Sequence, residues 1–472
     1  MIPAGDEVGC RLLSGFGRAG ASDGRIRRPR DQADVSEALA AAARDGAPVI
    51  ARGLGRSYGD AAQCSGGTVL DCSGLDAVHD ADWRTGTLRL GAGVSLTRLL
   101  ELAVPRGWFP PVTPGTASVS IGGAIAADVH GKNHHRDSSF GAFVARLVLE
   151  TPAGSVPLDP EQTPEHFWAT VGAMGLTGVI SEATIRLRPI ESARLRVETR
   201  RADDLDQCMA ILAAADENAP YSVAWVDGTA RGKHLGRSVI TLADHARRDE
   251  LPVRQRADAL SYRPRRPVPV PATPPVNLVT APVVAAFNEA YFRRAPARAR
   301  TDLATIGSYF YPLDVLASWN RLYGPRGFTQ YQFVVPFAAD GVVRRAFELL
   351  QGAHQTPTLV VLKRFGAADR APLSFPRPGW TVAIDLALGA PGLPDALDRL
   401  DELVATAGGR VYLAKDGRLR PELVPVMYPR LAEFASACAT LDPTQILASD
   451  LSRRLRIRGE RAGGVRREGE TG

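Results

Sequence analysis

A glycine-rich loop directly after a short apolar strand limits what this chain can fold into. Residues 47–50 are predicted to form a buried strand, and the loop that follows carries Gly53, Gly55 and Gly59. Three glycines let successive backbone N–H groups converge on an anion with no side chains in the way. Their spacing, and the lack of an amphipathic helix after Asp60, do not fit the dinucleotide fingerprint of a Rossmann unit. The loop is therefore either a tight turn or a pyrophosphate-binding loop of another fold.

Three more glycine-containing segments follow within the first 180 residues and favour the pyrophosphate interpretation. In residues 114–127, Gly122 and Gly123 precede small side chains, so the backbone can approach a flat ligand closely, and Ser120 supplies a hydroxyl. Another segment, at residues 172–180, follows a predicted helix and is weak evidence by itself.

The segment at residues 128–135 combines Asp128 with three histidines. Metal binding would need His130 and His134 on one face of a helix, but the intervening glycine and asparagine disfavour that helix. We therefore expect a polar loop that lines a cofactor, with buried structural histidines as the alternative, and no metal site.

The first unit is predicted to be α+β and to end near residue 190. A glycine closes a helix over residues 32–46, and Ser95 caps a second helix whose apolar face recurs at helical spacing. Short strands are expected at residues 68–71, 87–90, 147–150, 179–180 and 183–187.

A second unit is expected over residues 191–410. An alternating strand at residues 193–198 opens it. Residues 263–275 are too rich in proline for a helix or a central strand, which predicts an exposed, semi-extended and mobile loop. That loop would be a surface excursion, a lid or a contact for a large substrate. Strands of one antiparallel sheet are expected at residues 330–335, 359–363 and 381–385.

The C-terminal part contains Tyr412 and Lys415 just after a strand-like stretch at residues 409–411. A lysine in such a place is a surface group or, if it is buried, a candidate base. Arginines crowd the last twenty residues, so residues 457–472 are predicted to be a basic disordered tail. Attraction to an anionic membrane or an acidic partner is the alternative.

The composition is that of an ordinary globular protein: 472 residues, 45% hydrophobic, 23% charged and a net charge of +6. The five cysteines are scattered without a Cys-x-x-Cys pair, which argues against a disulfide framework or a zinc site. No apolar run reaches about eighteen residues and the N-terminus lacks the layout of a signal peptide, so the cytoplasm is the default location. No basic stripe interleaved with aromatic residues points to nucleic acid.

Together these segments resemble the flavoproteins of the vanillyl-alcohol oxidase/p-cresol methylhydroxylase type, which hold the FAD pyrophosphate in the first glycine loop. Within that superfamily the resemblance narrows to the decaprenylphosphoryl-β-D-ribose 2'-oxidase family and covers residues 11–456. It rests on residues 52–60, 130–135, 328–333, 371–376 and 448–451. The resemblance implies a two-domain α+β fold with an FAD-binding domain at 11–190, an antiparallel substrate domain at 191–410, and a segment at 411–456 that returns to the flavin.

The resemblance also implies which residues hold FAD. The loop at residues 51–61 would bind the pyrophosphate, and the other residues would line the rest of the cofactor. Arg56 stands where related aldonolactone and alditol oxidases often carry a flavin-linked histidine, which implies non-covalent FAD. The implied cofactor residues are Ala51, Arg52, Gly53, Leu54, Gly55, Arg56, Ser57, Tyr58, Gly59, Asp60, Ala61, Gly115, Ser120, Ile121, Gly122, Gly123, Ala127, Asp128, Val129, His130, Ile180 and Tyr412.

Other residues would surround the sugar, and among them Lys415 is the leading candidate for a base or an alkoxide stabiliser. The catalytic group implied by the resemblance is Lys415, Gln332, Tyr58 and Lys132. The adjoining pocket wall would consist of Trp225, Gln330, Lys363, Phe365 and Ala383.

Two positions depart from the mycobacterial pattern. Ala383 stands where those proteins carry a cysteine, so inhibitors that trap this cysteine covalently are not expected to label the chain. Phe310 stands where they carry a tyrosine, so a hydroxyl contact there is not expected.

The implied reaction oxidises the ribose 2'-hydroxyl of decaprenylphosphoryl-β-D-ribose to a 2'-keto sugar. An NADH-dependent keto-sugar reductase would be the partner that completes epimerisation to the arabinose form used in actinobacterial cell-wall arabinan. The prenyl chain implies peripheral contact with the inner membrane, with the periplasmic side as an alternative to the cytoplasm. The competing interpretations are an aldonolactone- or alditol-type sugar oxidase and, from another class, a flavin-free scaffold or sugar-phosphate binding module.

Overall fold

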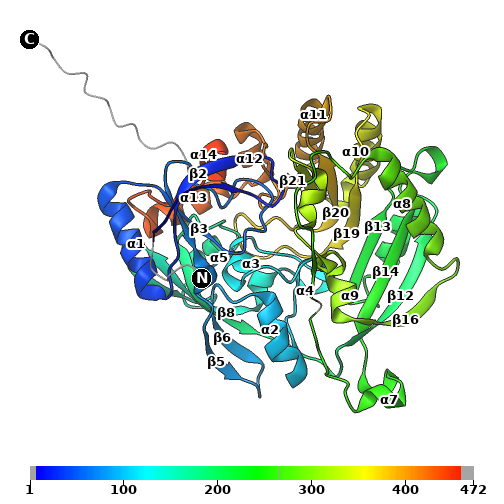
Figure 1. Cartoon of the computed structure of the whole chain (residues 1–472), viewed down its shortest axis with the longest axis horizontal. Coiled ribbons are helices and arrows are strands. Elements are labelled where there is room, and N and C mark those ends of the chain that lie inside the picture. Colours follow the sequence, from blue (N-terminus) through cyan, green and yellow to red (C-terminus); the bar gives the residue numbers. More distant parts are fainter. Residues whose placement is uncertain (1–6, 265, 459–472) are drawn as a thin grey trace, which may run out of the picture.

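The structure is a computed structural model that describes residues 7–264 and 266–458. Helices and mostly antiparallel sheets are mixed along the chain, which confirms the predicted α+β class. In Figure 1 the blue and cyan N-terminal part lies beside a green and yellow part, and the orange and red C-terminal helices return to the N-terminal part. None of the helices in the described stretches is long and apolar enough to cross a bilayer.

A four-stranded sheet opens the chain and positions the glycine loop. Its elements are β1 (Glu7–Ser14), β2 (Ala21–Arg27), α1 (Gln32–Asp45), β3 (Val49–Arg52) and β4 (Thr68–Asp71). The strand order is β1-β2-β4-β3, with β4 parallel to both of its neighbours. Helix α1 covers the sheet because Val35 and Leu39 share one core with Leu70. Asp31 caps the helix and Gly46 ends it at φ 62°, so the predicted helix is confirmed.

A five-stranded antiparallel sheet follows, in the order β5-β6-β10-β8-β9. Its strands are β5 (Val78–Asp82), β6 (Thr87–Gly91), β8 (Val144–Thr151), β9 (Gly154–Leu158) and β10 (Val179–Arg186). We expected two strands at residues 179–180 and 183–187, but β10 is continuous because its pairing with β8 runs on past a bulge between Ile180 and Glu182.

Short helices connect these strands. They are α2 (Leu96–Ala103), α3 (Ile121–Ala126), α4 (His134–Asp137) and α5 (Pro164–Thr170), and the small strands β7 (Trp108–Phe109) and β11 (Arg188–Pro189) pair nearby. The helix after Ser95 is confirmed, with its predicted apolar face buried. Helix α3 was not predicted, because two glycines in six residues disfavour a helix on propensity alone.

An eight-stranded antiparallel sheet forms the second part of the molecule, in the order β16-β12-β14-β13-β19-β20-β18-β21. Its strands are β12 (Arg194–Ala202), β13 (Tyr221–Val226), β14 (Ser238–His245), β16 (Arg300–Thr305), β18 (Phe328–Val335), β19 (Leu359–Phe365), β20 (Gly379–Ala387) and β21 (Arg410–Val411). The prediction that residues 330–335, 359–363 and 381–385 belong to one sheet is confirmed.

The two faces of this sheet have different roles. One face packs its apolar side chains in a core with α6 (Leu205–Ala215), α10 (Gly341–Gly352) and α11 (Leu393–Thr406). On the other face the register aligns Gln332 of β18, Ala383 of β20 and Val361 of β19, because directly paired residues share a face. Period-2 alternation then places Gln330, Asp385 and Lys363 on that same face, here called the site face. Trp225 of β13 joins it because it pairs directly with Val361.

The C-terminal segment returns to the first sheet. It contains α12 (Val424–Met427), α13 (Leu431–Leu441) and α14 (Asp450–Arg454). Leu447 forms a bridge with Val49 of β3, and Ala448 N donates to Val49 O at 3.1 Å. The prediction that a tail begins at residue 457 places its start too early. Ile457 is buried, and Arg458 pairs with Asp442 at 2.7 Å. Residues 459–472, the rest of that prediction, lie outside the described residues.

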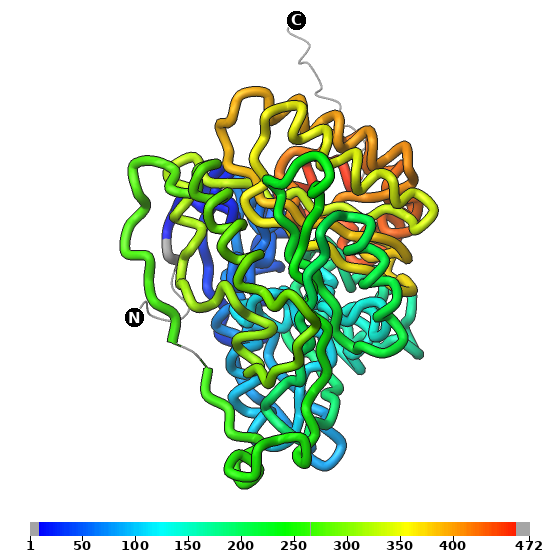
Figure 2. Tube along the Cα trace, turned by 90° about the vertical axis from the view of Figure 1, so that its right-hand side faces the viewer, coloured from blue at the N-terminus to red at the C-terminus, as the bar shows by residue number. Residues whose placement is uncertain are grey.

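The proline-rich segment lies on the surface. Its regular structure is β15 (Val268–Pro269), which pairs in parallel with β17 (Leu316–Ala317). Arg321 holds the next residues by donating to the carbonyls of Val270 and Pro271 at 2.8 and 2.9 Å. Figure 2 shows this green stretch along the left edge of the molecule. For residues 263–264 and 266–275 the prediction of an exposed segment without helix or central strand is confirmed, residue 265 lies outside the described residues, and the mobility of the segment stays a prediction.

Three further helices complete the second part. They are α7 (Val253–Arg256), α8 (Ala281–Arg294) and α9 (Ile306–Phe310). Helix α8 is held by its inner face, where Asn288 donates to Asp227 Oδ1 at 2.7 Å, and the opposite face is exposed.

Candidate functional site

A cavity of about 680 Å³ opens where the glycine loop meets α3 and the chain before β10. Its wall comes mainly from three stretches far apart in the sequence, at residues 51–62, 120–127 and 170–180. The lining side chains are glycine, alanine, serine, threonine and cysteine, apart from Met174 and Ile180.

Glycines bring the backbones of this wall into close contact. A Cβ added to Gly53 would lie 2.2 Å from Ser120 Oγ, and one added to Gly122 would lie 2.8 Å from the Cβ of Ala92. Ser120 is fixed because its hydroxyl caps α3, accepting from Gly123 N at 3.3 Å. The cavity is thus bounded by backbone and small side chains, which fits a long, flat dinucleotide such as FAD.

The cavity wall contains part of the predicted cofactor set: Ala51, Gly53, Ser57, Ala61, Ser120, Gly122, Gly123, Ala127 and Ile180. It also contains residues that the sequence did not assign to the cofactor: Ala62, Cys72, Ala92, Ala126, Thr170, Met174, Gly175, Thr177 and Gly178. The glycine segment at residues 172–180 was the signal for several of these. Cys72 and Ala92 carried no signal, because each lies just beyond a strand and outside every motif.

The remaining predicted cofactor residues lie outside this wall, and several are engaged by the protein itself. Arg52 donates to Ala62 O and Ser14 O at 3.1 and 2.9 Å, and Arg56 donates to Ser118 O at 3.0 Å. These guanidinium groups bind backbone carbonyls and so hold the shape of the loop. Neither arginine lines the cavity, so the predicted contact of these residues with the cofactor is not observed. Leu54, Gly55, Gly115, Ile121 and Val129 also lie outside the lining.

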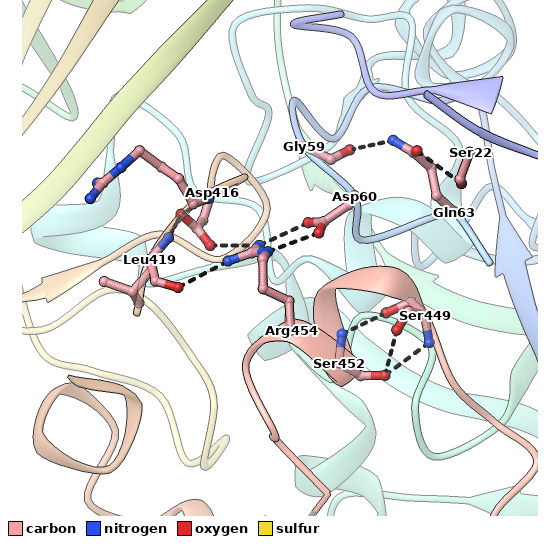
Figure 3. Close-up of polar contacts among 10 residues, drawn as sticks. Ser22, Gly59, Asp60, Gln63, Asp416, Leu419, Ser449, Ser452 and Arg454 are labelled. Atoms are coloured by element: carbon pink, nitrogen blue, oxygen red, sulfur yellow. Dashed lines mark hydrogen bonds and ion pairs between the residues drawn. The ribbon is translucent and has the colours of Figure 1, made fainter. Parts of the chain in front are cut away.

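Asp60 and Asp128, also assigned to the cofactor, bind other protein groups. Figure 3 shows Arg454 of α14 between the carboxylates of Asp60 and Asp416, at 2.9 Å from each, and it also donates to Leu419 O at 3.1 Å. Asp128 accepts from Ser374 Oγ at 2.5 Å, and burial raises its pKa well above the ordinary value. Both carboxylates therefore join separate segments of the fold.

The glycine loop leads directly to Lys415. Tyr58 N donates to Ala414 O at 2.9 Å, and the ammonium of Lys415 lies 4.0 Å from the centroid of the Tyr58 ring. Lys415 donates to Gln330 Oε1, and Gln330 Nε2 donates to Asp385 Oδ1 at 2.5 Å. Lys415, Tyr58 and Gln330 were predicted to lie near one another, whereas Asp385 was seen only as the end of a strand.

Gln332 connects the site face to the histidine segment. Its Nε2 donates to Thr381 Oγ1 at 3.3 Å and lies 2.9 Å from His130 Nε2. The Thr381 hydroxyl donates to Phe333 O, so its oxygen is an acceptor, which orients the Gln332 amide with its nitrogen toward His130. His130 Nε2 accepts from this amide in the tautomer that carries the proton on Nδ1.

The Tyr412 side chain lies between the histidine segment and the cavity. Its hydroxyl donates to Ala127 O at 2.6 Å, and its backbone N donates to Gln332 O at 2.9 Å. The ring stacks on Phe375 at 4.7 Å, and His130 packs at 5.2 Å from it. Tyr412 thus joins the cavity wall to the site face.

The histidines serve packing and hydrogen bonding. His134 is buried against the Phe365 ring at 4.4 Å, and His135 Nε2 lies 2.9 Å from Ala219 O. The structure starts α4 at His134, so His130 and His134 do not share a helix face. Over residues 7–264 and 266–458, no group of three or more His, Cys, Asp or Glu side chains could hold a metal ion.

Lysines dominate the charge of the site. Burial lowers the pKa of Lys415 to about 7, with the carboxylate of Asp385 opposing this shift and Lys363 adding to it. Burial lowers the pKa of Lys132 to about 7 and that of Lys363 to about 8. Asp385 responds in the opposite direction, because burial raises its pKa. Ammonium groups near neutral pH can therefore exchange protons in this site.

The predicted pocket wall shares the site face. Ala383 pairs with Gln332 on one side and with Val361 on the other, and Trp225 pairs with Val361. The Trp225 ring packs against Tyr291 of α8 at 4.5 Å. Phe365, at the end of β19, is fully buried.

The comparisons with known proteins first define a class. Residues 25–157 match the family of FAD binding domains, which covers the glycine loop, α3 and the histidine segment. The chain is therefore an FAD-binding oxidoreductase of mixed α/β architecture. The cavity agrees with this FAD-binding class, because its walls of backbone and small side chains fit a dinucleotide.

A relative over nearly the full length then gives the family. The chain is 38% identical over 453 residues to decaprenylphosphoryl-β-D-ribose oxidase of Mycolicibacterium smegmatis, which covers 95% of this chain and 98% of that protein. It is 40% identical over 371 residues to an uncharacterized protein of Streptomyces coelicolor, covering 77% of this chain and all of that protein. An L-gulono-1,4-lactone dehydrogenase of Mycobacterium tuberculosis is 32% identical over 165 residues, 35% of this chain and 38% of that protein. The chain belongs to the decaprenylphosphoryl-β-D-ribose oxidase family.

Proposed function

We propose that this protein oxidises the 2'-hydroxyl of decaprenylphosphoryl-β-D-ribose to a 2'-keto sugar, with FAD as its cofactor. One observation carries the proposal: the loop that walls the cavity is bonded to the segment that carries Lys415, through Tyr58 N and Ala414 O. A proton-handling group is thus attached to the loop beside the place where a flavin fits. The name of the full-length relative supplies the substrate class.

FAD would be held by the loop at residues 51–61, by Ser120, Gly122 and Gly123, and by the segment at residues 174–180. When bound, it supplies the two-electron acceptor for the C–H bond of the sugar. Arg56, which stands at the position of the flavin-linked histidine in related oxidases, cannot form that bond, so the cofactor would be held without a covalent link.

Lys415 would handle the proton of the 2'-hydroxyl. With a pKa near 7 it can accept this proton as a neutral amine, or stabilise the developing alkoxide as a cation. Gln330 orients the amine by accepting from it, and Asp385 holds Gln330 in turn. Tyr58 and Gln332 would orient the sugar ring on the site face.

A lipid-linked substrate calls for contact with a membrane. Val283, Phe287 and Tyr291 lie at i, i+4 and i+8 on α8 and are 56%, 58% and 40% exposed. Phe287 stacks on Tyr291 at 5.9 Å, and Tyr291 contacts Trp225, so this apolar stripe leads from the surface to the site face. We infer peripheral attachment through α8, which follows the proline-rich segment in the chain.

Epimerisation needs a second protein. The 2'-keto product would be reduced by an NADH-dependent keto-sugar reductase, which adds hydride from the opposite face and gives the arabinose form. The proposed enzyme would therefore work beside such a partner at the inner membrane.

The direct test is an anaerobic titration of the purified yellow protein with decaprenylphosphoryl-β-D-ribose. Bleaching of the flavin near 450 nm is expected at about one equivalent, with a 2'-keto product detected by mass spectrometry. A matched titration uses small polyols and aldonolactones. Bleaching by these soluble sugars alone, with rapid peroxide formation in air, would assign the protein to the aldonolactone-type oxidases instead.

A further inference from the structure

Lysine is rare in this chain and is concentrated in one place. Among 57 basic residues only four are lysines, Lys132, Lys233, Lys363 and Lys415. Lys233 is exposed, Lys363 lies on the site face, and Lys415 donates to Gln330 of that face. Lys132 lies close enough to Lys363 for the charge of Lys363 to lower the pKa of Lys132. Arginine stays charged under all ordinary conditions, whereas lysine is a compact point charge that can release its proton when buried. Three partly buried lysines at this site, in a chain that otherwise uses arginine, point to a chemical need for this group.

Two of these lysines have no acidic partner among the residues that the structure describes. Lys132 donates to Tyr309 O, and its ammonium lies 3.9 Å from the centroid of the Tyr309 ring. The ammonium of Lys363 lies 5.8 Å from the Phe365 centroid and forms no ion pair within the described residues. Lys415 differs, because Asp385 lies close enough to favour its charged form.

The surroundings of Lys363 are positive rather than acidic. Its charge lowers the pKa values of Lys132, Lys415, His130 and His134. Burying an ammonium group without a counter-ion is costly, and each further positive charge adds to that cost. A ligand that carries a negative charge would remove the cost on binding.

We propose that Lys363 and Lys132 form the binding site for the phosphodiester group of the lipid-linked sugar, beside the sugar that faces Lys415. The proposal rests on the proposed function and names the part of the substrate that these two ammonium groups bind. A phosphodiester carries one negative charge and offers non-bridging oxygens that accept from ammonium donors. In the free enzyme the lysines can lose their protons, and binding of the anion would cause the lysines to take up protons again.

The test measures equilibrium binding to the FAD-loaded protein, so that it does not depend on turnover. The ligands are a short-chain prenylphosphoryl 2'-deoxy-β-D-ribose, which lacks the reacting hydroxyl, and its neutral methylphosphonate counterpart. Calorimetry at pH 8 in two buffers of different ionisation enthalpy gives both the affinity and the number of protons taken up. The variants are Lys363→Met and Lys132→Met, with the exposed Lys233→Met as the matched control.

The parent protein is expected to bind the anionic ligand about tenfold or more tightly than the neutral one, with proton uptake. Lys363→Met and Lys132→Met should lose most of this preference, and Lys233→Met should keep it. The Tm of Lys363→Met at pH 7 should not fall, because the variant removes a partly buried charge that has no acidic partner among the described residues.

Two results would contradict the proposed anion site. In one, Lys363→Met keeps the full preference for the anionic ligand; in the other, it lowers the affinity for both ligands equally. Absence of any preference in the parent protein would do the same. Flavin reduction by the ribose substrate in the parent protein is recorded separately. If the anion preference is present but the flavin is not reduced, the proposed function fails while the anion site stands.

Discussion

Lys415 owes its chemical character to its surroundings. A lysine on the surface keeps its charge far above neutral pH, but burial brings the pKa of Lys415 down to about 7. Gln330 lies between this amine and Asp385, so the carboxylate acts on Lys415 both through its charge and through the orientation of the amide. The site thus adjusts one amino group with two neighbouring side chains of the same sheet face.

Replacing Lys415 by alanine tests its role directly. Lys415→Ala should retain yellow FAD, because no atom of this side chain lines the cavity, but lose substrate-dependent bleaching by about 10²–10⁴-fold. Stopped-flow absorbance under anaerobic conditions measures the rate. Lys233→Met is the control and should bleach at the parental rate. A Lys415→Ala protein that bleaches as fast as the parent would exclude Lys415 from the reaction.

Asp385→Asn tests the neighbour. Because the carboxylate raises the pKa of Lys415, its removal should lower that pKa further, and the limb of the pH–rate profile that belongs to Lys415 should move to lower pH. The direction is the same whether the amine acts as a base or as a cation. Flavin reduction rates between pH 5 and 9 give the profile.

The control for Asp385→Asn is Asp401→Asn, which changes another buried aspartate on α11, beside Arg418. It should lower the Tm and leave the pH–rate profile in place. An unshifted profile in Asp385→Asn would mean that the carboxylate does not act on Lys415.

At the scale of elements, the five-residue helix α14 joins the two halves of the site. Ser449 and Ser452 cap it reciprocally, and its Arg454 reaches both Asp60 of the glycine loop and Asp416 next to Lys415 (Figure 3). The loop and the 416 turn touch so closely that a Cβ on Gly59 would lie 1.9 Å from Asp416 O. The position of Lys415 relative to the cavity therefore depends on this contact.

Arg454→Met should weaken the contact by leaving the partly buried carboxylate of Asp60 and the buried carboxylate of Asp416 without their partner. We expect a loss of about 2–3 kcal/mol of stability, reduced from the cost of a fully buried pair because the arginine is 25% exposed, and weaker retention of FAD. Thermal unfolding and the release of fluorescent FAD on dilution measure the two effects. The control is Arg453→Met on the same helix, whose 3.5 Å pair with Asp450 is more exposed. Equal effects of the two variants would contradict the special role of Arg454.

For the whole molecule, the site depends on parts that meet only in the folded chain. The cavity belongs to the N-terminal part, the site face to the second part, and α14 to the C-terminal segment that returns to the N-terminal part (Figure 1). The apolar stripe of α8 reaches Trp225 on the same sheet, so the surface proposed to meet the membrane is connected to the site by direct ring contacts.

Changing this stripe should affect membrane binding without affecting the chemistry. A Val283→Asp/Phe287→Asp double variant should lose most of its flotation with anionic liposomes, since it removes apolar area and adds negative charge. It should still bleach with a short-chain soluble substrate. The control, Val426→Asp, changes a residue 58% exposed on α12 and should float like the parent. Unchanged flotation of the double variant would exclude α8 as the contact.

The sequence by itself determined the local elements and the class of the protein. Alternation and capping predicted α1, α2 and the central strands of the large sheet, because these signals depend on neighbours in the chain. The glycine spacing separated the loop from a Rossmann unit, and the long motifs around Arg52 and His130 indicated the family. Lys415, Gln330 and Lys363 could be named as site residues from the resemblance.

Only the tertiary structure decided which groups act on one another. Asp385 was the end of a predicted strand until the register placed it beside Gln330, and Arg458 was assigned to a predicted tail, whereas the structure pairs it with Asp442. Helix α3 forms against its own propensity because packing against Ala92 and the cap by Ser120 outweigh it. Burial, register and long-range pairing set pKa values and partners, and none of these is a property of residues close together in the sequence.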